Sequence, residues 1–214
     1  MYRLYVKLKT YHRKRKKIRN LNRQGSNTIL KLQNILERSG LFFFFDMGTL
    51  LGIVREGRIL KHDLDIDVAV YASSEDEKEF LRNLLMENSC RRRLSFSIDG
   101  LGIVEESFIY KNIKFDINYY YRENNDDVCY LMYSSPKNDS PSEYMNVVRL
   151  GCKPILTTCK KKFGNSSIFI PVDAESYLAE RYGSNWRVPD KQYIYWKGPS
   201  TTQTDYLALR TVYE

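Results

Sequence analysis

The stretch DMGTLLGIVREGRILKHDLDIDVAV, residues 46–70, contains the pattern that decides the fold. It follows an aromatic run at residues 41–45, which predicts a buried strand, and its Gly48-Thr49 pair opens a segment with the apolar spacing of a helix. Its second half, residues 63–70, alternates acidic and apolar residues and predicts a strand. The sequence therefore predicts a strand, a glycine-led helix and a second strand in close succession.

Three aspartates of the second strand, Asp63, Asp65 and Asp67, are expected on one face, because residues two apart on a strand point the same way. Neighbouring carboxylates raise each other's pKa unless positive charge lies between them. A hard divalent cation supplies that charge, and Mg²⁺ takes one or two carboxylates together with phosphate oxygens. The pattern indicates a Mg²⁺ or Mn²⁺ site on Asp65 and Asp67. The plainer alternative is a solvated strand end that leads into a turn.

The helix that begins at Gly48 and Thr49 is a candidate phosphate site. Backbone N–H groups and a hydroxyl at a helix N-terminus can receive a phosphate, although a Gly-Thr pair alone is a weak signal. Arg55 follows one to two helical turns later, where a guanidinium could reach an anionic donor. An exposed surface charge is an equally good interpretation of Arg55.

Three antiparallel strands are predicted downstream, at residues 102–110, 113–121 and 128–133. The middle strand contains Asp116 between Phe115 and Ile117, which are expected in the apolar core. A buried carboxylate is costly without partners, so we expect Asp116 to face the same site as Asp65 and Asp67. The alternative is an acid on the surface of an edge strand.

The motif at residues 48–55 (GTLLGIVR), followed by residues 62–67 (HDLDID), resembles the signature of the LicD/fukutin family. The acidic run of that family ends in Asp-hydrophobic-Asp, which Asp65 and Asp67 preserve, whereas Leu64 stands where another acid is usual. The resemblance implies a nucleotidyltransferase-like fold with a third carboxylate from a neighbouring strand. Asp116 is the candidate, either as a further metal ligand or as the base that accepts the proton of an acceptor hydroxyl.

The same resemblance implies an enzyme that moves phosphocholine, ribitol phosphate or glycerol phosphate from a CDP-linked donor to a hydroxyl of a cell-surface glycan or glycolipid. Two alternatives stay open. One is transfer of the nucleotide itself to a small molecule or a polymer end. The other is a catalytically inert module that docks on membrane or RNA.

We predict an α+β domain with a nucleotidyltransferase-like mixed sheet and helices packed on one face. The expected catalytic domain covers residues 24–190, between a basic arm at residues 1–23 and a tail at residues 191–214 that is rich in tyrosine and has no recognisable motif. Within the domain, Ser26 or Asn27 is expected to begin a helix that Gly40 ends.

The net charge of +8 is concentrated in the arm, where residues 1–23 contain ten Lys or Arg and no acid. The rest of the chain has a net charge of −2, which argues against a nucleic-acid partner for the folded body. The arm has Leu4, Leu8 and Tyr11 at helical spacing, and we favour contact with an anionic membrane surface. A solvated arm and contact with RNA phosphates are the alternatives.

The remaining composition gives an expectation about location. The sequence has no apolar run approaching the ~18 residues that span a bilayer, and its N-terminus lacks the apolar core of a secretory signal. Its four cysteines are spaced neither as a zinc site nor as a disulfide scaffold. A cytoplasmic protein is therefore expected, with peripheral contact at the inner face of the membrane.

Overall fold

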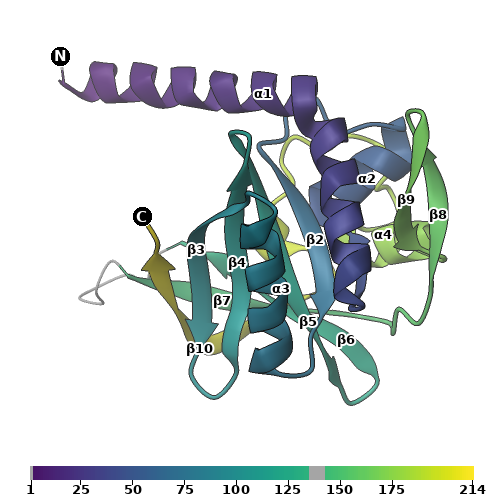
Figure 1. Ribbon diagram of the computed structural model, residues 1–214. Coiled ribbons are helices and arrows are strands. Elements are labelled where there is room, and N and C mark those ends of the chain that lie inside the picture. The colour runs from purple at the N-terminus through teal and green to yellow at the C-terminus, as the bar shows by residue number, and fades with distance from the viewer. Residues whose placement is uncertain (1, 135–142) are drawn as a thin grey trace.

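The computed structural model of the chain describes residues 2–134 and 143–214, with side chains from residue 10 onward. It is an α+β domain built on one large twisted sheet (Figure 1). The strands of this sheet are β1 (Phe42–Phe45), β2 (Asp65–Tyr71), β3 (Arg91–Ile98), β4 (Gly102–Tyr110), β5 (Ile113–Glu123), β6 (Asp126–Tyr133), β7 (Tyr144–Cys152) and β10 (Thr201–Val212). A separate hairpin consists of β8 (Thr158–Phe163) and β9 (Ser166–Pro171). The helices are α1 (Tyr2–Ser39), α2 (Met47–Glu56), α3 (Glu75–Glu87), α4 (Ala174–Tyr182) and the short 3₁₀ helix η1 (Tyr195–Lys197).

The large sheet has the order β1-β2-β5-β4-β3-β10-β7-β6, and β5 also pairs with β6. This extra pairing closes the strands from β5 to β6 into a ring, from which β2 and β1 extend. The pair β2–β5 is parallel, whereas β5 is antiparallel to both β4 and β6. The prediction of a mixed sheet is confirmed.

The aromatic run and the second strand also form as predicted. Phe44 and Phe45 are fully buried in β1, which pairs antiparallel with β2. The helix α2 connects these two strands, so the strand, helix and strand of residues 41–71 lie side by side. The segment between α2 and β2 packs closely against α2 at Gly52. A Cβ at Gly52 would lie 2.6 Å from the carbonyl oxygen of Arg58.

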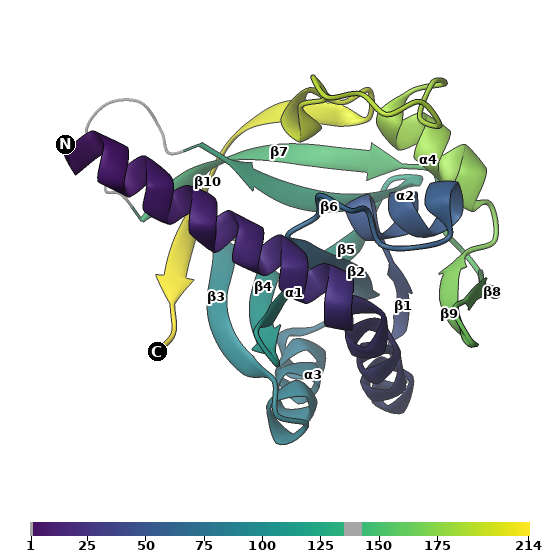
Figure 2. The ribbon, with the colours of Figure 1, turned by 90° about the horizontal axis from the view of Figure 1, so that it is seen from above.

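Helices cover both faces of the sheet, and the prediction that they pack on one face is wrong. Two consecutive residues of β5 show this, since alternate side chains of a strand point to opposite faces. The Tyr119 ring lies 5.1 Å from Nζ of Lys78 in α3, whereas the Tyr120 hydroxyl is 3.0 Å from that of Tyr177 in α4. Seen from above, α1 and α3 lie on one side of the sheet, and α2 and α4 on the other (Figure 2).

The first helix is much longer than predicted, because it begins at Tyr2 and not at Ser26 or Asn27. Its packing against the body begins at the fully buried Leu21. Gly25 does not interrupt the helix but lets Ile59 approach, since a Cβ at Gly25 would lie 2.5 Å from the Ile59 side chain. Residues 10–17 are exposed on all sides, and this half of α1 projects beyond the sheet (Figure 1).

The residues after Lys191, for which the sequence indicated no element, complete the sheet. β10 pairs antiparallel with both β3 and β7, so it is one of the strands of the ring, with a neighbour on each side, and not an edge strand. None of the helices in the described residues is both long enough and apolar enough to span a membrane.

Candidate active site

The register of two parallel strands brings the predicted carboxylates together. In the β2–β5 pair, Asp65 lies opposite Lys114 and Asp67 lies opposite Asp116. Asp65, Asp67 and Asp116 therefore share one patch, on the face of the sheet that α2 and α4 cover. This arrangement agrees with the expectation that Asp116 faces the other two aspartates.

Asp116 is held by two neighbours. Ser107 on β4 donates a hydrogen bond to its Oδ1 at 2.5 Å, and Lys114 donates to its Oδ2 at 2.6 Å. The same ammonium group lies 3.1 Å from Oδ2 of Asp65, so it links carboxylates of two strands. Lys114 was not among the predicted site residues, although its place two residues before Asp116 on one strand puts both side chains on one face.

Thr49 has a structural contact at the place where we expected a phosphate ligand. Its side chain is fully buried, and its Oγ1 accepts a hydrogen bond from the backbone N–H of Asp67 at 3.0 Å. The backbone N–H of Asp46, the residue before α2, donates to the carbonyl oxygen of Asp67 at 3.0 Å. The N-terminus of α2 thus fixes the backbone on both sides of Asp67.

Gly48 lies against the carboxylate of Asp63. A Cβ at Gly48 would be 3.1 Å from both carboxylate oxygens of Asp63, so a larger residue would push this group away. Asp63 precedes β2 and approaches the first turn of α2, where the partial positive charge of the helix end favours an anion. Its Oδ2 is buried and has no hydrogen-bond partner in the described part of the chain.

Arg55 is nearly buried beside Asp63. It donates to the carbonyl oxygen of Trp186 and to Glu56, both at 3.3 Å, while its Nε has no hydrogen-bond partner in the described residues. The guanidinium lowers the pKa of Asp63 against the larger effect of burial, so its charge acts on the cluster. Arg55 is therefore not simply an exposed surface charge. His62, in contrast, is exposed.

The cluster has too little positive charge for its carboxylates. Burial, followed by the charges of Asp65 and Asp116, raises the pKa of Asp67 well above its ordinary value. Burial and the Asp65 charge raise the pKa of Asp63 to about 7, and burial and the Asp116 charge raise that of Glu105 to about 8. Burial lowers the pKa of the Lys114 ammonium group. The negative charges of Asp116, Asp65 and Glu105 have the larger, opposite effect and raise this pKa well above its ordinary value. One ammonium group therefore has to compensate several carboxylates.

These features fit a divalent cation. The buried oxygen of Asp63 without a partner, and the raised pKa of Asp67, are what a hard cation would relieve. In the residues that the structure describes, no three carboxylate, imidazole or thiolate side chains converge on one ready-made point. Mg²⁺ does not require such a set, because it commonly uses one or two carboxylates together with substrate phosphates and water.

A buried network next to the cluster was also missed. Asp46 is fully buried, and its two oxygens accept hydrogen bonds from the hydroxyls of Tyr120 and Tyr177 at 2.6 and 2.8 Å. Arg181 of α4 lies 3.9 Å from the same carboxylate. This network joins the start of α2 to β5 and α4. An isolated aspartate gives no periodic signal, so the sequence did not reveal it.

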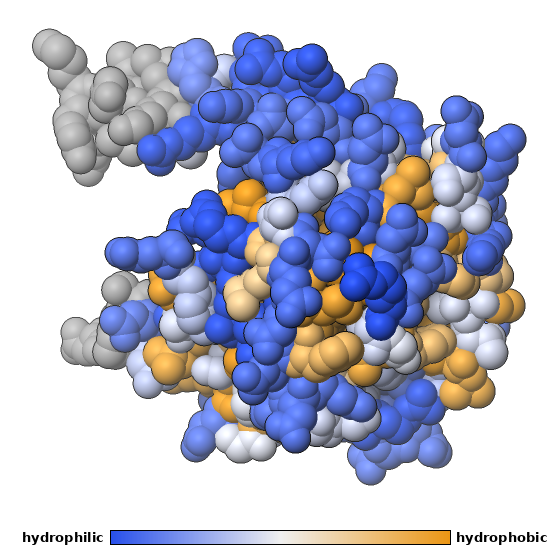
Figure 3. All heavy atoms as spheres, in the orientation of Figure 1, coloured by the Kyte–Doolittle hydropathy of each residue, from blue (hydrophilic) through white to orange (hydrophobic). Residues whose placement is uncertain are grey.

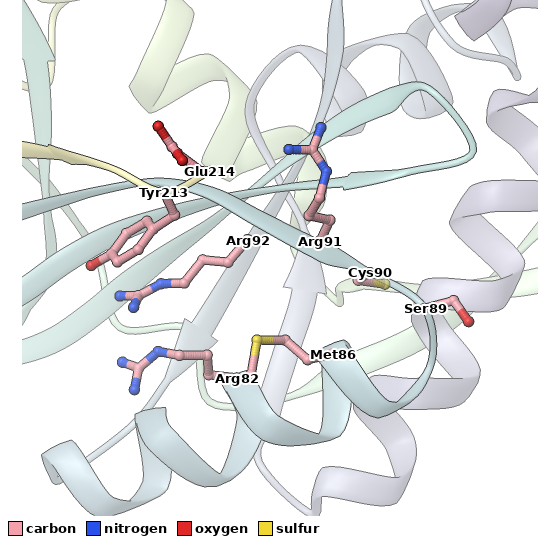
Figure 4. Close-up of a pocket in the computed structure, with 8 residues that line it drawn as sticks. All are labelled: Arg82, Met86, Ser89, Cys90, Arg91, Arg92, Tyr213 and Glu214. Carbon is pink, nitrogen blue, oxygen red and sulfur yellow. The ribbon is translucent and has the colours of Figure 1, made fainter.

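One cavity in the described part of the chain lies away from these carboxylates. Its volume is about 490 Å³, and its lining includes Arg82, Arg92 and Tyr213 (Figure 4). Arg82 and Arg92 point the same way, but both pair with the fully buried Glu106, at 2.8 and 2.6 Å. Glu106 offsets only one of these two positive charges, and Arg91 also lines the cavity, so the cavity presents arginines and not the carboxylates of the candidate site.

Comparisons with known proteins show the family to which the chain belongs. Residues 40–146, half of the chain, match the family described as LicD/FKTN/FKRP, nucleotidyltransferase domain. Over 187 residues, 85% of the chain, the sequence is 23% identical to ribitol-5-phosphate transferase FKTN of Macaca fascicularis and 22% identical to the Homo sapiens protein. The Mus musculus protein is 24% identical over the same length. The chain spans 37% of the length of each of these relatives.

Proposed function

Because the chain belongs to the LicD/FKTN/FKRP nucleotidyltransferase-domain family, we propose that it transfers a phosphorus-linked alcohol from a CDP-linked donor to a hydroxyl of a glycan or glycolipid. Phosphocholine, ribitol phosphate and glycerol phosphate are the candidate groups. The observation that carries the proposal is the carboxylate cluster of β2 and β5 beside the N-terminus of α2. Phosphoryl transfer relies mainly on positioning and on neutralising charge, and this cluster has the groups for both.

In this proposal, Asp65 and Asp67 hold Mg²⁺ or Mn²⁺, and the free oxygen of Asp63 is a further ligand. When bound, the cation neutralises the negative charge of the donor phosphates. Arg55 supplies a second positive charge on the α2 side of the cluster. Thr49 acts indirectly, through its hydrogen bond to the backbone of Asp67. Gly48 leaves room for the Asp63 carboxylate.

Asp116 is proposed as the base that accepts the proton of the acceptor hydroxyl. Both of its oxygens already accept hydrogen bonds, from Ser107 at 2.5 Å and from Lys114 at 2.6 Å, whereas Lys114 contacts only one oxygen of Asp65, which supports Asp116 as the base and Asp65 as the ligand. Burial and the charge of Asp65 raise the pKa of Asp116 against the opposing effects of Lys114 and Ser107, so the carboxylate is a better proton acceptor than an exposed aspartate.

Transfer of the nucleotide itself is the second enzymatic candidate. Product analysis distinguishes the two reactions, since transfer of the phospho-alcohol releases CMP, whereas nucleotide transfer from a triphosphate releases pyrophosphate. An inert docking module would give neither product.

The proposal is tested by thermal denaturation with CDP-choline, CDP-ribitol and CDP-glycerol, each with and without Mg²⁺. A ligand that binds only the native state at about 100 times its Kd adds about 2.7 kcal/mol of stability. We expect stabilisation that requires Mg²⁺ in the wild type, and its loss in Asp67→Asn.

The matched control is Asp99→Asn, which changes an exposed aspartate in the β3–β4 turn. It should respond as the wild type does. Retention by Asp67→Asn of more than about a tenth of wild-type turnover at saturating Mg²⁺ would contradict the metal assignment, because losing a charged ligand should cost at least that factor.

We also propose that the projecting half of α1 contacts an anionic membrane surface. Residues 10–17 are exposed and include five consecutive cations at residues 13–17, with no acid before Glu37. Hydrophilic side chains cover the described part of this projection (Figure 3). A membrane contact there would hold the domain near a lipid-linked acceptor.

A further inference from the structure

A row of aromatic side chains lies on the segment between α4 and β10, for which the sequence suggested no role. We define the aromatic row as Tyr193, Tyr195 and Trp196. Tyr195 and Trp196 belong to η1, and the row precedes the strand that completes the ring. The segment lies on the same side of the sheet as α4 (Figure 2).

The first residue of the row is fixed to the end of α4. The Tyr193 hydroxyl donates to the carbonyl oxygen of Arg181 at 3.5 Å, and its ring centroid is 4.9 Å from that of Tyr182. Gly198 allows this packing, because a Cβ there would lie 2.8 Å from the Tyr193 hydroxyl. The ring therefore has a fixed place.

The other two residues are fixed to β6. The Tyr195 hydroxyl donates to the carbonyl oxygen of Met132 at 2.5 Å, and the Tyr195 ring meets Trp196 edge-on at 4.8 Å. Trp196 stacks on Tyr133 with centroids 5.6 Å apart and planes 15° apart. Although held at its hydroxyl, Tyr195 remains 41% exposed. An exposed ring that is already immobilised is a preformed surface for stacking.

The row is connected to the carboxylate cluster at Tyr193. Arg181, whose carbonyl oxygen accepts from Tyr193, has its guanidinium 3.9 Å from Asp46, and the Asp46 N–H donates to the carbonyl oxygen of Asp67. Tyr182, which supports Tyr193, is within electrostatic range of Asp67, and Tyr195 is within range of Glu105 and Lys114. Glu105 lies on β4, across β5 from Asp67 and α2, whereas Lys114 lies on β5 itself, where its ammonium group links Asp116 and Asp65. The ring of Tyr195 thus borders the Glu105 side of the site.

We propose that the aromatic row is the acceptor subsite and stacks a sugar ring of the glycan. This inference rests on the proposed function. In-line displacement at phosphorus puts the attacking and leaving oxygens on opposite sides. If the leaving nucleotide lies on the side of Arg55 and α2, the attacking hydroxyl arrives from the side of Asp116, Glu105 and Tyr195.

The chemistry of the row suits a sugar. The C–H face of a pyranose carries slight positive charge and packs on the negative face of an aromatic ring. Glu105, which is partly exposed beside Tyr195, can accept hydrogen bonds from sugar hydroxyls. A few directed polar groups next to an aromatic surface are typical of small-molecule sites.

Binding of the full chain to an array of immobilised mono- and oligosaccharides, without donor, tests the subsite. Tyr195→Ala removes the ring, whereas Tyr195→Phe keeps the ring and removes only the hydroxyl. Tyr206→Ala is the control for loss of an exposed tyrosine elsewhere, on β10. A stacking contact of about 0.5–1.5 kcal/mol corresponds to a roughly two- to twelvefold loss of affinity.

We expect the wild type to retain a defined set of glycans, Tyr195→Ala to lose them by that factor, and Tyr195→Phe and Tyr206→Ala to keep them. The affinity for CDP with Mg²⁺, measured by calorimetry, should be the same in all four proteins. Absence of glycan binding by the wild type, unchanged binding by Tyr195→Ala, or loss of CDP affinity in that variant would each overturn the subsite. Glycan binding that depends on Tyr195, in a protein that binds no CDP, would instead support the subsite and contradict the proposed donor.

Discussion

At the scale of single residues, Asp63 connects the chemistry of the site with folding stability. Its pKa is raised from an ordinary value of 3.8 to about 7, first by burial and then by the charge of Asp65. The folded state therefore binds this proton more tightly than the unfolded state between those two values. Stability must fall as the pH rises through that range, because the unfolded chain gives up the proton more readily.

We predict that the metal-free protein has a lower melting temperature at pH 8 than at pH 5, and that Asp63→Asn reduces this slope. The raised pKa of Asp67 acts in the same direction, so a slope of the same sign remains in the variant. Thermal denaturation in the presence of a chelator measures the effect. Asp99→Asn should keep the wild-type slope, and an Asp63→Asn slope equal to wild type would show that Asp63 is not the titrating group.

Mg²⁺ should counteract the loss at pH 8 and have less effect at pH 5. A cation competes with protons for the same carboxylates, so it binds more strongly where they are ionised. Equal stabilisation at both pH values would indicate that the cation binds away from these groups.

At the scale of secondary-structure elements, the sequence predicted those strands and helix ends that depend on neighbouring residues in the chain. The run of phenylalanines and the alternation of residues 63–70 predicted β1 and β2. The start of α3 depends on an equally local pattern, a serine followed three residues later by a glutamate. In the structure, the Ser74 hydroxyl accepts the backbone N–H of Glu77 at 3.2 Å. In the register of β2 and β5, Asp116 lies opposite Asp67. The alternation of apolar and polar residues along β5 had predicted that Asp116 faces this site.

The elements that the sequence did not predict depend on distant partners. Ala208 is the single buried residue of β10, so the strand lacks the alternation of apolar and polar residues by which strands are recognised. Its pairing with β3 and β7 arises from backbone hydrogen bonds between segments far apart in the chain. The place of Tyr195 in the site follows from that pairing, and so it could not be predicted from the Tyr-rich tail alone.

We predict that deletion of residues 201–214 destabilises the domain severely, because β3 and β7 each lose a neighbouring strand. Thermal denaturation and amide hydrogen exchange on β3 and β7 measure the loss. If the truncated chain does not accumulate, Ala208→Glu tests the same element by placing a charge at its fully buried position. As a control, deletion of residues 1–17, which precede Leu21, the first buried residue among those of α1 whose side chains the structure describes, should leave the melting temperature nearly unchanged. A stable protein without β10 would contradict the topology.

At the scale of the whole molecule, the positive charge is concentrated in the first half of α1, outside the folded body. The cations of α1 project from a body with a net charge of −2, and each cation near an anionic membrane adds about 1 kcal/mol of attraction. We predict that substitution of residues 13–17 by glutamine abolishes sedimentation with phosphatidylserine vesicles. Wild-type binding should weaken with added salt, since surface electrostatics are screened beyond roughly 10 Å at 0.1 M ionic strength.

The matched control substitutes Lys160, Lys161 and Lys162 of β8, which are exposed cations on another element, by glutamine. This variant should sediment as the wild type does. Equal sedimentation of the 13–17 variant would contradict the membrane contact, and loss of retention on RNA without loss on vesicles would favour RNA as the partner of α1.

The position of β10 also has a consequence for synthesis on the ribosome. Ala208 pairs with Ile98 on one side and with Met145 on the other, so β3 and β7 emerge long before the strand that separates them. Until β10 leaves the exit tunnel, the nascent chain presents two unpaired strand edges, and such edges readily pair with other chains. We expect newly made chains to depend on chaperones during this interval and to be released soon after β10 is translated.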